Sequence, residues 1–169
     1  MRTEAEMEDV MARYGEFLYR LALTMVHSDA DACDMTAETM AQYLFSDKVF
    51  ESEAHRRAWL ITVLRNRSRN LLRYHRRHQT VELSDNIPQR QSGYGREEAA
   101  ILARIRPLPE KYRTILYLYY AEEYSIREIA EMLSVTQACA EKRLQRAREK
   151  CAAIWKNEEG NERVCIRES

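Results

Sequence analysis

The chain has 169 residues, of which 45% are apolar and 32% charged, a composition that folds instead of staying disordered. It has only four glycines and three prolines, which excludes a β-sandwich or barrel, because those folds need a turn about every 8–12 residues. The net charge is zero but strongly segregated: residues 1–54 carry 12 acidic and 4 basic side chains, and residues 55–78 carry 8 arginines and no acidic residue. The two blocks predict two different partners, unless the arginines simply form a solvated helix face.

The first half of the chain shows helical periodicity. Apolar spacing predicts helices over about residues 6–27 and 54–77, with another between them that starts at a Ser28 cap. Residues 46–55 break the pattern and predict a loop. Residues 79–96 combine Gly and Pro with little apolar content, which predicts a flexible linker.

The second half predicts shorter helices. One is expected over residues 97–106 and another from Glu110 to Ala121, with Pro109 at its first turn. A capping box at Ser125–Glu128 opens a helix through Leu133, and after a tight turn Thr136 caps a last, basic helix. The apolar stripe of that helix consists of Ala140, Leu144, Ala147 and Cys151. Two helices joined in this way favour a helix-turn-helix, with a plain helical hairpin as the alternative.

Several classes of function are not supported by the pattern. No apolar run approaches the roughly 18 residues of a membrane span, so no membrane insertion is expected. The four cysteines have no CxxC spacing, and we interpret them as reduced thiols of a cytoplasmic protein. Neither a nucleophile–base constellation nor a metal-binding spacing is present, so we expect no enzyme, no metal, no cofactor and no small-molecule substrate.

Two segments resemble a known family. Residues 108–150 contain Leu-Pro-Glu-Lys-Tyr-Arg, Tyr-Ser-Ile-Arg-Glu-Ile-Ala-Glu-Met-Leu and Lys-Arg-Leu-Gln-Arg-Ala-Arg, and they resemble the fourth region of a bacterial sigma factor. Residues 14–78 resemble the second region, through segments such as Arg57-Ala58-Trp59-Leu60 and Arg65-Asn66. A short linker takes the place of the third region, which is the layout of the extracytoplasmic-function (ECF) type. Two motifs in this order are more specific than either alone.

The resemblance implies an all-α protein of two small helical domains joined by a flexible linker. Residues 1–78 would bind the polymerase clamp and melt the promoter, residues 97–155 would form the DNA-binding helix-turn-helix, and residues 156–169 would be a polar tail. The implied function is a sigma factor that directs core RNA polymerase to promoter DNA, reading the −10 element with the first domain and the −35 element with the second. It also allows for an anti-sigma factor as a partner. The alternatives are a stand-alone helix-turn-helix regulator and a helical adaptor protein.

The resemblance also assigns residues to each surface. Polymerase binding is expected at Asp31, Asp34, Ala37 and Glu38. Contacts to the −10 element are expected at Phe50, Trp59, Arg65, Asn66, Arg67, Arg69, Asn70 and Arg73. Contacts to the −35 element are expected at Thr136, Gln137, Ala138, Glu141, Lys142, Arg143, Gln145 and Arg146.

Residue chemistry leaves some of these roles open. Gln137, Glu141 and Lys142 suit adenine, cytosine and guanine, whereas arginines suit phosphates. Glu141 could instead pair along its own helix with a glutamine one turn away. Phe50 is either a wall of a base pocket or an ordinary core anchor. Trp59 is assigned to the core in preference to base stacking.

Overall fold

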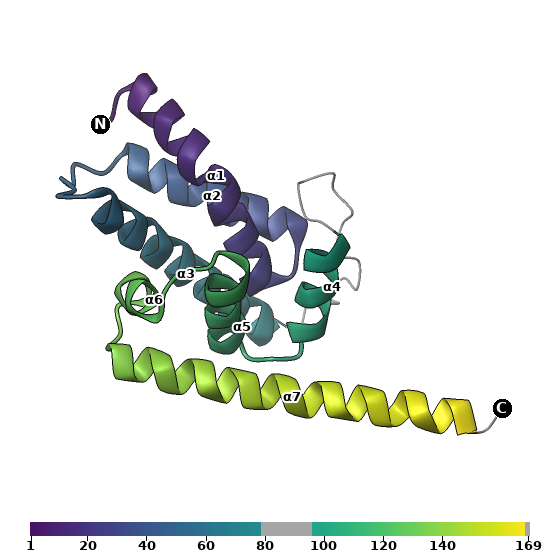
Figure 1. Ribbon diagram of the computed structural model, residues 1–169. Helices are drawn as coiled ribbons and strands as arrows, with labels where there is room; N and C mark the ends of the chain where they lie inside the picture. Colours follow the sequence, from purple (N-terminus) through teal and green to yellow (C-terminus); the bar gives the residue numbers. More distant parts are fainter. Residues whose placement is uncertain (79–95, 168–169) are drawn as a thin grey trace.

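The computed structural model describes the backbone of residues 1–78 and 96–167, and the side chains of residues 1–78, 100 and 102–157. All regular structure in this part of the chain is helical, which confirms the all-α expectation (Figure 1). The expected linker over residues 79–96 lies outside the described residues, except for Arg96, where a helix begins.

Three helices form the N-terminal domain: α1 (Glu4–Val26), α2 (Asp29–Leu44) and α3 (Glu53–His78). A capping box between Thr3 and Glu6 opens α1, and His27 ends it with a left-handed φ of 58°. Ser28 caps α2 by accepting a hydrogen bond from the Asp31 N–H at 3.3 Å, as the sequence predicts. Because the turn between these helices is so short, α2 folds back along α1, and α3 packs against both.

The C-terminal domain is built from α4 (Arg96–Ile105), α5 (Glu110–Leu116), the π-helical turn η1 (Tyr117–Ala121), α6 (Ile126–Leu133) and α7 (Gln137–Arg167). The capping box at Ser125 and Glu128 is present, with the Glu128 N–H donating to Ser125 Oγ at 3.3 Å. The helix predicted over residues 110–121 is present, but its last turn widens into a π-helical turn. There the Glu122 N–H donates to the Tyr117 carbonyl at 3.2 Å, across five residues instead of four.

The last helix is longer than the sequence predicts. α7 lies along one side of the molecule and continues to Arg167 (Figure 1). The segment expected as a polar tail from residue 156 therefore has a helical backbone up to that point.

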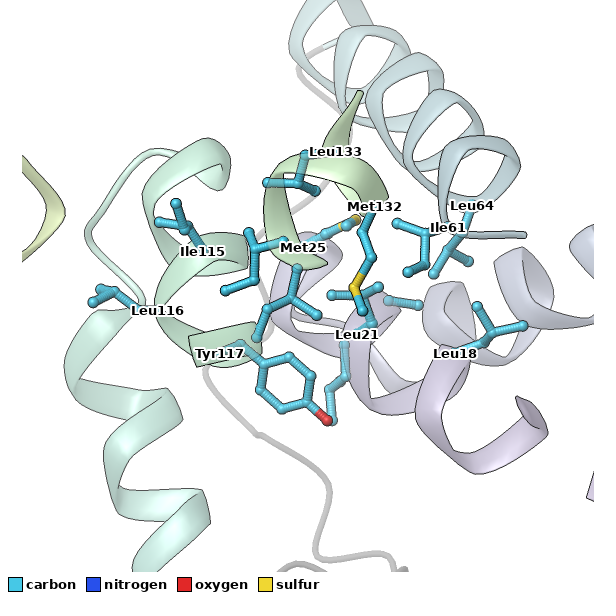
Figure 2. Close-up of a cluster of buried hydrophobic side chains, with 14 of the residues drawn as sticks. Leu18, Leu21, Met25, Ile61, Leu64, Ile115, Leu116, Tyr117, Met132 and Leu133 are labelled. Carbon is cyan, nitrogen blue, oxygen red and sulfur yellow. The ribbon is translucent and has the colours of Figure 1, made fainter. Parts of the chain in front are cut away.

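The two domains share one hydrophobic core, a feature that helical periodicity in the sequence does not predict. Figure 2 shows side chains from α1 and α3 packed against side chains from α5, η1 and α6. None of them is more than 7% exposed: Leu18, Leu21, Met25, Ile61, Leu64, Ile115, Leu116, Tyr117, Met132 and Leu133. Burying each large apolar side chain stabilises the fold by roughly 1.5–3 kcal/mol, so the domains are docked by the same force that folds each of them.

Candidate DNA and polymerase interfaces

The start of α7 is fixed by local interactions. Thr136 caps the helix by accepting a hydrogen bond from the Cys139 N–H at 3.2 Å, as the sequence predicts. Just before it, Ser134 ends α6 with a left-handed φ of 54°, which reverses the chain between the two helices. The predicted apolar stripe of α7 is confirmed, with Ala140, Leu144, Ala147 and Cys151 all buried against the rest of the domain.

The opposite face of α7 carries the residues expected to meet the −35 element. Arg143 is half-buried, and the others are exposed: Thr136, Gln137, Ala138, Glu141, Lys142, Gln145 and Arg146. The Gln137 side-chain amide donates to a carboxylate oxygen of Glu141 at 3.0 Å. The alternative expected for Glu141, a pair along its own helix, is therefore present in the free protein. The pair stands on the exposed face, where DNA could replace it.

A basic groove runs beside this face. It has a volume of about 400 Å³ and lies where α5 approaches the start of α7. Its lining comprises Lys111, Tyr112, Thr136, Ala138, Cys139, Lys142, Arg143 and Arg146. Lys111 was not among the expected DNA contacts. The feature that could have indicated it is its basic side chain in the first turn of α5, the helix that precedes the helix-turn-helix.

The exposed face of α3 carries part of the expected −10 surface. Asn66, Asn70 and Arg73 are exposed and follow one another at spacings of four and three residues, so they share a face. Arg67, on the neighbouring side, donates to Gln42 Oε1 at 3.0 Å and forms an ion pair with Glu38 of α2. Asn66, Asn70 and Arg73 thus form a continuous polar stripe that is open to solvent.

A second stripe of α3 departs from the expectation. Arg65 is only 8% exposed, and its guanidinium donates to the Leu133 carbonyl at 3.1 Å. Arg69, four residues after Arg65 on α3, pairs with Glu110 of α5 at 3.5 Å. Arg65 and Arg69 therefore form a row that faces the C-terminal domain. The expectation that Arg65 is free to hold a phosphate is corrected for this conformation, because domain docking buries it. Burial is also the main cause that lowers the pKa of Arg65.

The loop between α2 and α3 covers residues 45–52, close to the predicted span. Phe50 anchors it: the ring stacks on Tyr43 with centroids 5.9 Å apart and meets Trp59 edge-on at 5.5 Å. The Arg2 guanidinium lies over the same cluster, 4.2 Å from the Tyr43 ring centre. Phe50 and Trp59 are half-buried, so both combine an anchoring role with a surface that solvent still reaches. Phe50 also lines an open pocket of about 320 Å³, together with Arg2, Ser46, Asp47, Lys48, Val49 and Arg56.

The residues expected to bind polymerase lie on α2. Asp34, Ala37 and Glu38 are exposed at helical spacing, on the side of α2 away from its buried residues. Asp31 is half-buried, with one carboxylate oxygen 3.9 Å from His75 Nε2. Asp34 and Ala37 are thus open to solvent, and Glu38 is exposed but forms an ion pair with Arg67.

The described residues offer neither a metal site nor a membrane-spanning helix. No group of three or more His, Cys, Asp or Glu side chains could hold a metal ion there. None of the helices described is both long enough and apolar enough to cross a membrane.

Two known families match separate parts of the chain. Residues 10–78 match Sigma-70 region 2, and residues 98–151 match Sigma-70, region 4. Over 156 residues the chain is 25% identical to the ECF RNA polymerase sigma factor SigM of Bacillus subtilis (strain 168), which covers 88% of this chain and 94% of SigM.

The chain belongs to the ECF sigma factors. The resemblance stated from the sequence is confirmed, and this sigma factor directs RNA polymerase to promoters. It is also 24% identical over 149 residues to the RNA polymerase sigma factor SigV of the same organism, covering 86% of this chain and 88% of that protein. The stand-alone regulator is not favoured by these matches.

Solved structures share the fold of this sigma factor. The sigma factor RpoE, in complex with the anti-sigma factor NepR from Bartonella quintana, superposes with a TM-score of 0.73 at 20% identity, over 89% of this chain and 97% of RpoE. CnrH, in complex with the cytosolic domain of CnrY, gives a TM-score of 0.64 at 22% identity, over 92% of this chain and 90% of CnrH.

Proposed function

We propose that this sigma factor divides promoter recognition between its two long basic helices: α7 reads the −35 element, and α3 with the loop 45–52 engages the melted −10 element. The observation that carries the proposal is the polarity of α7. One side of the helix is fully used by the core of its own domain, and the other presents amide, carboxylate and ammonium groups to solvent. A helix of this kind fits the major groove of DNA, where base edges are distinguishable.

The α7 face would combine base reading with phosphate binding. Lys142 stands in the basic groove and suits guanine, while Gln137 and Glu141 suit adenine and cytosine. On DNA these two residues would exchange their mutual hydrogen bond for base edges. Arg146 and Lys111 line the same groove and would hold the phosphates on either side.

The α3 surface would hold the melted strand. Asn66 and Asn70 offer amide groups to unpaired bases, and Arg73 offers a cation to the backbone. Phe50 provides the wall of an open pocket for an extruded base, with Trp59 supporting it from behind.

Polymerase binding would fall to α2, through the acidic face at Asp34 and Glu38. The N-terminal unit then covers residues 1–78 and the DNA-reading unit residues 97–155. The protein would act in the cytoplasm with core RNA polymerase and promoter DNA, with no catalytic group, metal or cofactor of its own. An anti-sigma factor is a further partner, because the RpoE neighbour was solved with one.

Transcription by purified core polymerase, on a genomic DNA library, tests the proposal. The wild-type chain should direct specific starts with shared −10 and −35 sequences. A Gln137→Ala/Glu141→Ala/Lys142→Ala variant should lose −35 selection while still binding polymerase. The matched control is Lys156→Ala, an exposed change farther along α7. Specific DNA binding without any polymerase-dependent start would instead favour the stand-alone regulator.

A further inference from the structure

Arg2, just before α1, contacts several parts of the N-terminal domain at once. Its backbone N–H donates to the Leu44 carbonyl at the end of α2, at 3.0 Å. Its guanidinium donates to the Lys48 carbonyl in the loop 45–52. The same group lies over two aromatic rings, 4.2 Å from the ring centre of Tyr43 and 5.2 Å from that of Phe50. One side chain thus joins the start of α1 to the end of α2 and to the loop that follows it.

These contacts engage the charge of Arg2 within the fold. The side chain is only 14% exposed, and one guanidinium nitrogen lies 3.8 Å from a Glu6 carboxylate oxygen. A cation over an aromatic face gains more energy as the pair loses water, and the Phe50 ring is half-buried. Arg73 of α3 is exposed instead. Arg2 is therefore placed to hold protein segments together, whereas Arg73 is placed to hold a DNA phosphate.

The loop 45–52 depends on side chains for its shape. Within it, the Ser46 hydroxyl accepts a hydrogen bond from the Lys48 N–H at 3.1 Å. The His55 ring meets the Phe50 ring edge-on, with centroids 5.5 Å apart. Arg2 contacts the loop at two separate places, the Lys48 carbonyl and the Phe50 ring. Removing its side chain would release both places together.

The same contacts shape the open pocket of about 320 Å³ beside Phe50. Arg2 and Arg56 line this pocket together with Phe50. Arg56 is paired with Glu53 at 2.8 Å, and its guanidinium lies 5.9 Å from the Phe50 ring centre. The aromatic surface of the pocket is thus bordered by two arginines that protein groups already hold. A base that entered the pocket would meet the Phe50 ring in a fixed orientation.

We propose that Arg2 is a positioning residue of the −10 base pocket: it holds the Phe50 ring and the loop 45–52 in the orientation that receives the extruded base. This inference rests on the proposed role of Phe50 as the wall of that pocket. Arg2 acts through Phe50 and contacts neither the base nor a phosphate. Its loss should therefore weaken the binding of one base of the −10 strand and leave the other positions unchanged.

The experiment uses holoenzyme assembled from core RNA polymerase and the full chain, with single-stranded −10 DNA from a promoter that it transcribes. Fluorescence anisotropy measures the affinity for the intact strand and for strands that each lack one base. The position at which base removal has no further effect in Phe50→Ala identifies the pocket base. Arg2→Ala is the test variant. Arg13→Ala is the matched control, because Arg13 is an exposed arginine of α1 that pairs with Asp9 of the same helix.

Binding of the intact strand should fall in both pocket variants. Phe50→Ala should weaken it at least about fivefold, as expected for a lost stacking contact. Arg2→Ala should weaken it about two- to fivefold, the range of one cation–π contact near the surface. On the strand that lacks the pocket base, neither variant should differ from wild type, and Arg13→Ala should match wild type on every strand. Equal weakening by Arg2→Ala on both strands would overturn the inference, because a lost phosphate contact or a general loss of structure acts on every strand alike.

Amide exchange in the free chain is a second measurement that needs no DNA. Arg2→Ala should speed exchange at the N–H groups of the loop 45–52, and Arg13→Ala should not. Unchanged exchange in the loop would also overturn the inference. Circular dichroism checks the helices. If Arg2→Ala loses helical content, Arg2→Gln decides by the same comparison of strands, because it removes the cation and keeps an amide donor for the Lys48 carbonyl.

Failure of the inference and failure of the proposed function give different results. If Phe50→Ala changes the effect of base removal at no single position, the base pocket itself is refuted, and the role of Arg2 with it. If one position depends on Phe50 but not on Arg2, only the positioning role is refuted.

Discussion

The two long basic helices of this sigma factor use their charges differently. In α7 the apolar stripe packs within its own domain, and Lys142 and Arg146 are left exposed. In α3 the basic residues are split between two faces: Arg73 is open to solvent, whereas Arg65 is buried against the C-terminal domain. A run of basic residues therefore does not by itself identify a DNA-binding face. The segments that pack against the other faces of the helix decide which of its basic residues remain available to DNA.

Charge reversal on α2 should separate the two domains by their binding to polymerase. Combining Asp34→Arg with Glu38→Arg reverses the exposed acidic face of α2 and should weaken retention by core polymerase at least tenfold, about 1.4 kcal/mol or more. Co-purification with core enzyme measures it. Glu131→Arg, a charge reversal at an exposed position of α6, is the control and should leave retention intact. Unchanged retention of a folded double variant would remove α2 from the polymerase interface.

A second prediction compares a shared core position with one that serves a single domain. Leu64→Ala and Leu144→Ala should each cost about 2–5 kcal/mol of unfolding free energy, because both side chains are buried. Leu64 packs where the domains meet, so its truncation should also speed hydrogen exchange in α6. Leu144→Ala should leave exchange in α2 unchanged. Urea unfolding and amide exchange measure the two effects, and equal exchange patterns in both variants would contradict a shared core.

Acidification should weaken the junction between α1 and the C-terminal domain. Burial, with the positive charges of Arg113 and Arg106, lowers the pKa of His27 to about 4, against about 6.5 in an unfolded chain. The unfolded state therefore binds more protons between these values, and stability falls as the pH is lowered from 6.5 to 4. The loss from this group is at most about 3 kcal/mol, and less where solvent reaches the ring.

His27→Asn isolates this effect, because asparagine tolerates the left-handed backbone and does not titrate. Urea midpoints at pH 7, 5.5 and 4.5 should fall less steeply in the variant than in the wild type. Identical slopes would show that His27 does not contribute.

Much of the fold follows from local signals in the sequence. The caps at Ser28, Ser125 and Thr136 form as predicted because each needs only a side-chain oxygen and an N–H three residues later. The buried stripe of α7 follows from helical spacing alone. Such features depend on residues close together in the chain, and the sequence displays them directly.

The docking of the domains could not be predicted in this way. Helical spacing shows that Leu64 faces a core, but not that residues of α6 complete it. Arg65 and Arg73 are equivalent as charges, and only the long-range contact with Leu133 makes one of them a structural residue. The role of Arg113, whose guanidinium donates to the Thr24 and Met25 carbonyls of α1, was missed for the same reason. Its one local signal is its position in a short helix whose next residues are all buried. The π-helical turn has no simple periodic signature.

A promoter-library selection with holoenzyme, run at two salt concentrations, tests the division of labour between α7 and α3 most directly. Lys142→Ala should change the preference at one −35 position by about 1–3 kcal/mol, the value of a good base contact. Arg73→Ala should weaken all promoters alike and reduce the salt slope by about one, as expected for a lost phosphate contact. Arg73 is the better probe than Arg67, which is already engaged with α2. If Lys142→Ala lowers every promoter equally while Arg73→Ala shifts the sequence preference, the account is contradicted and the reading helix is α3.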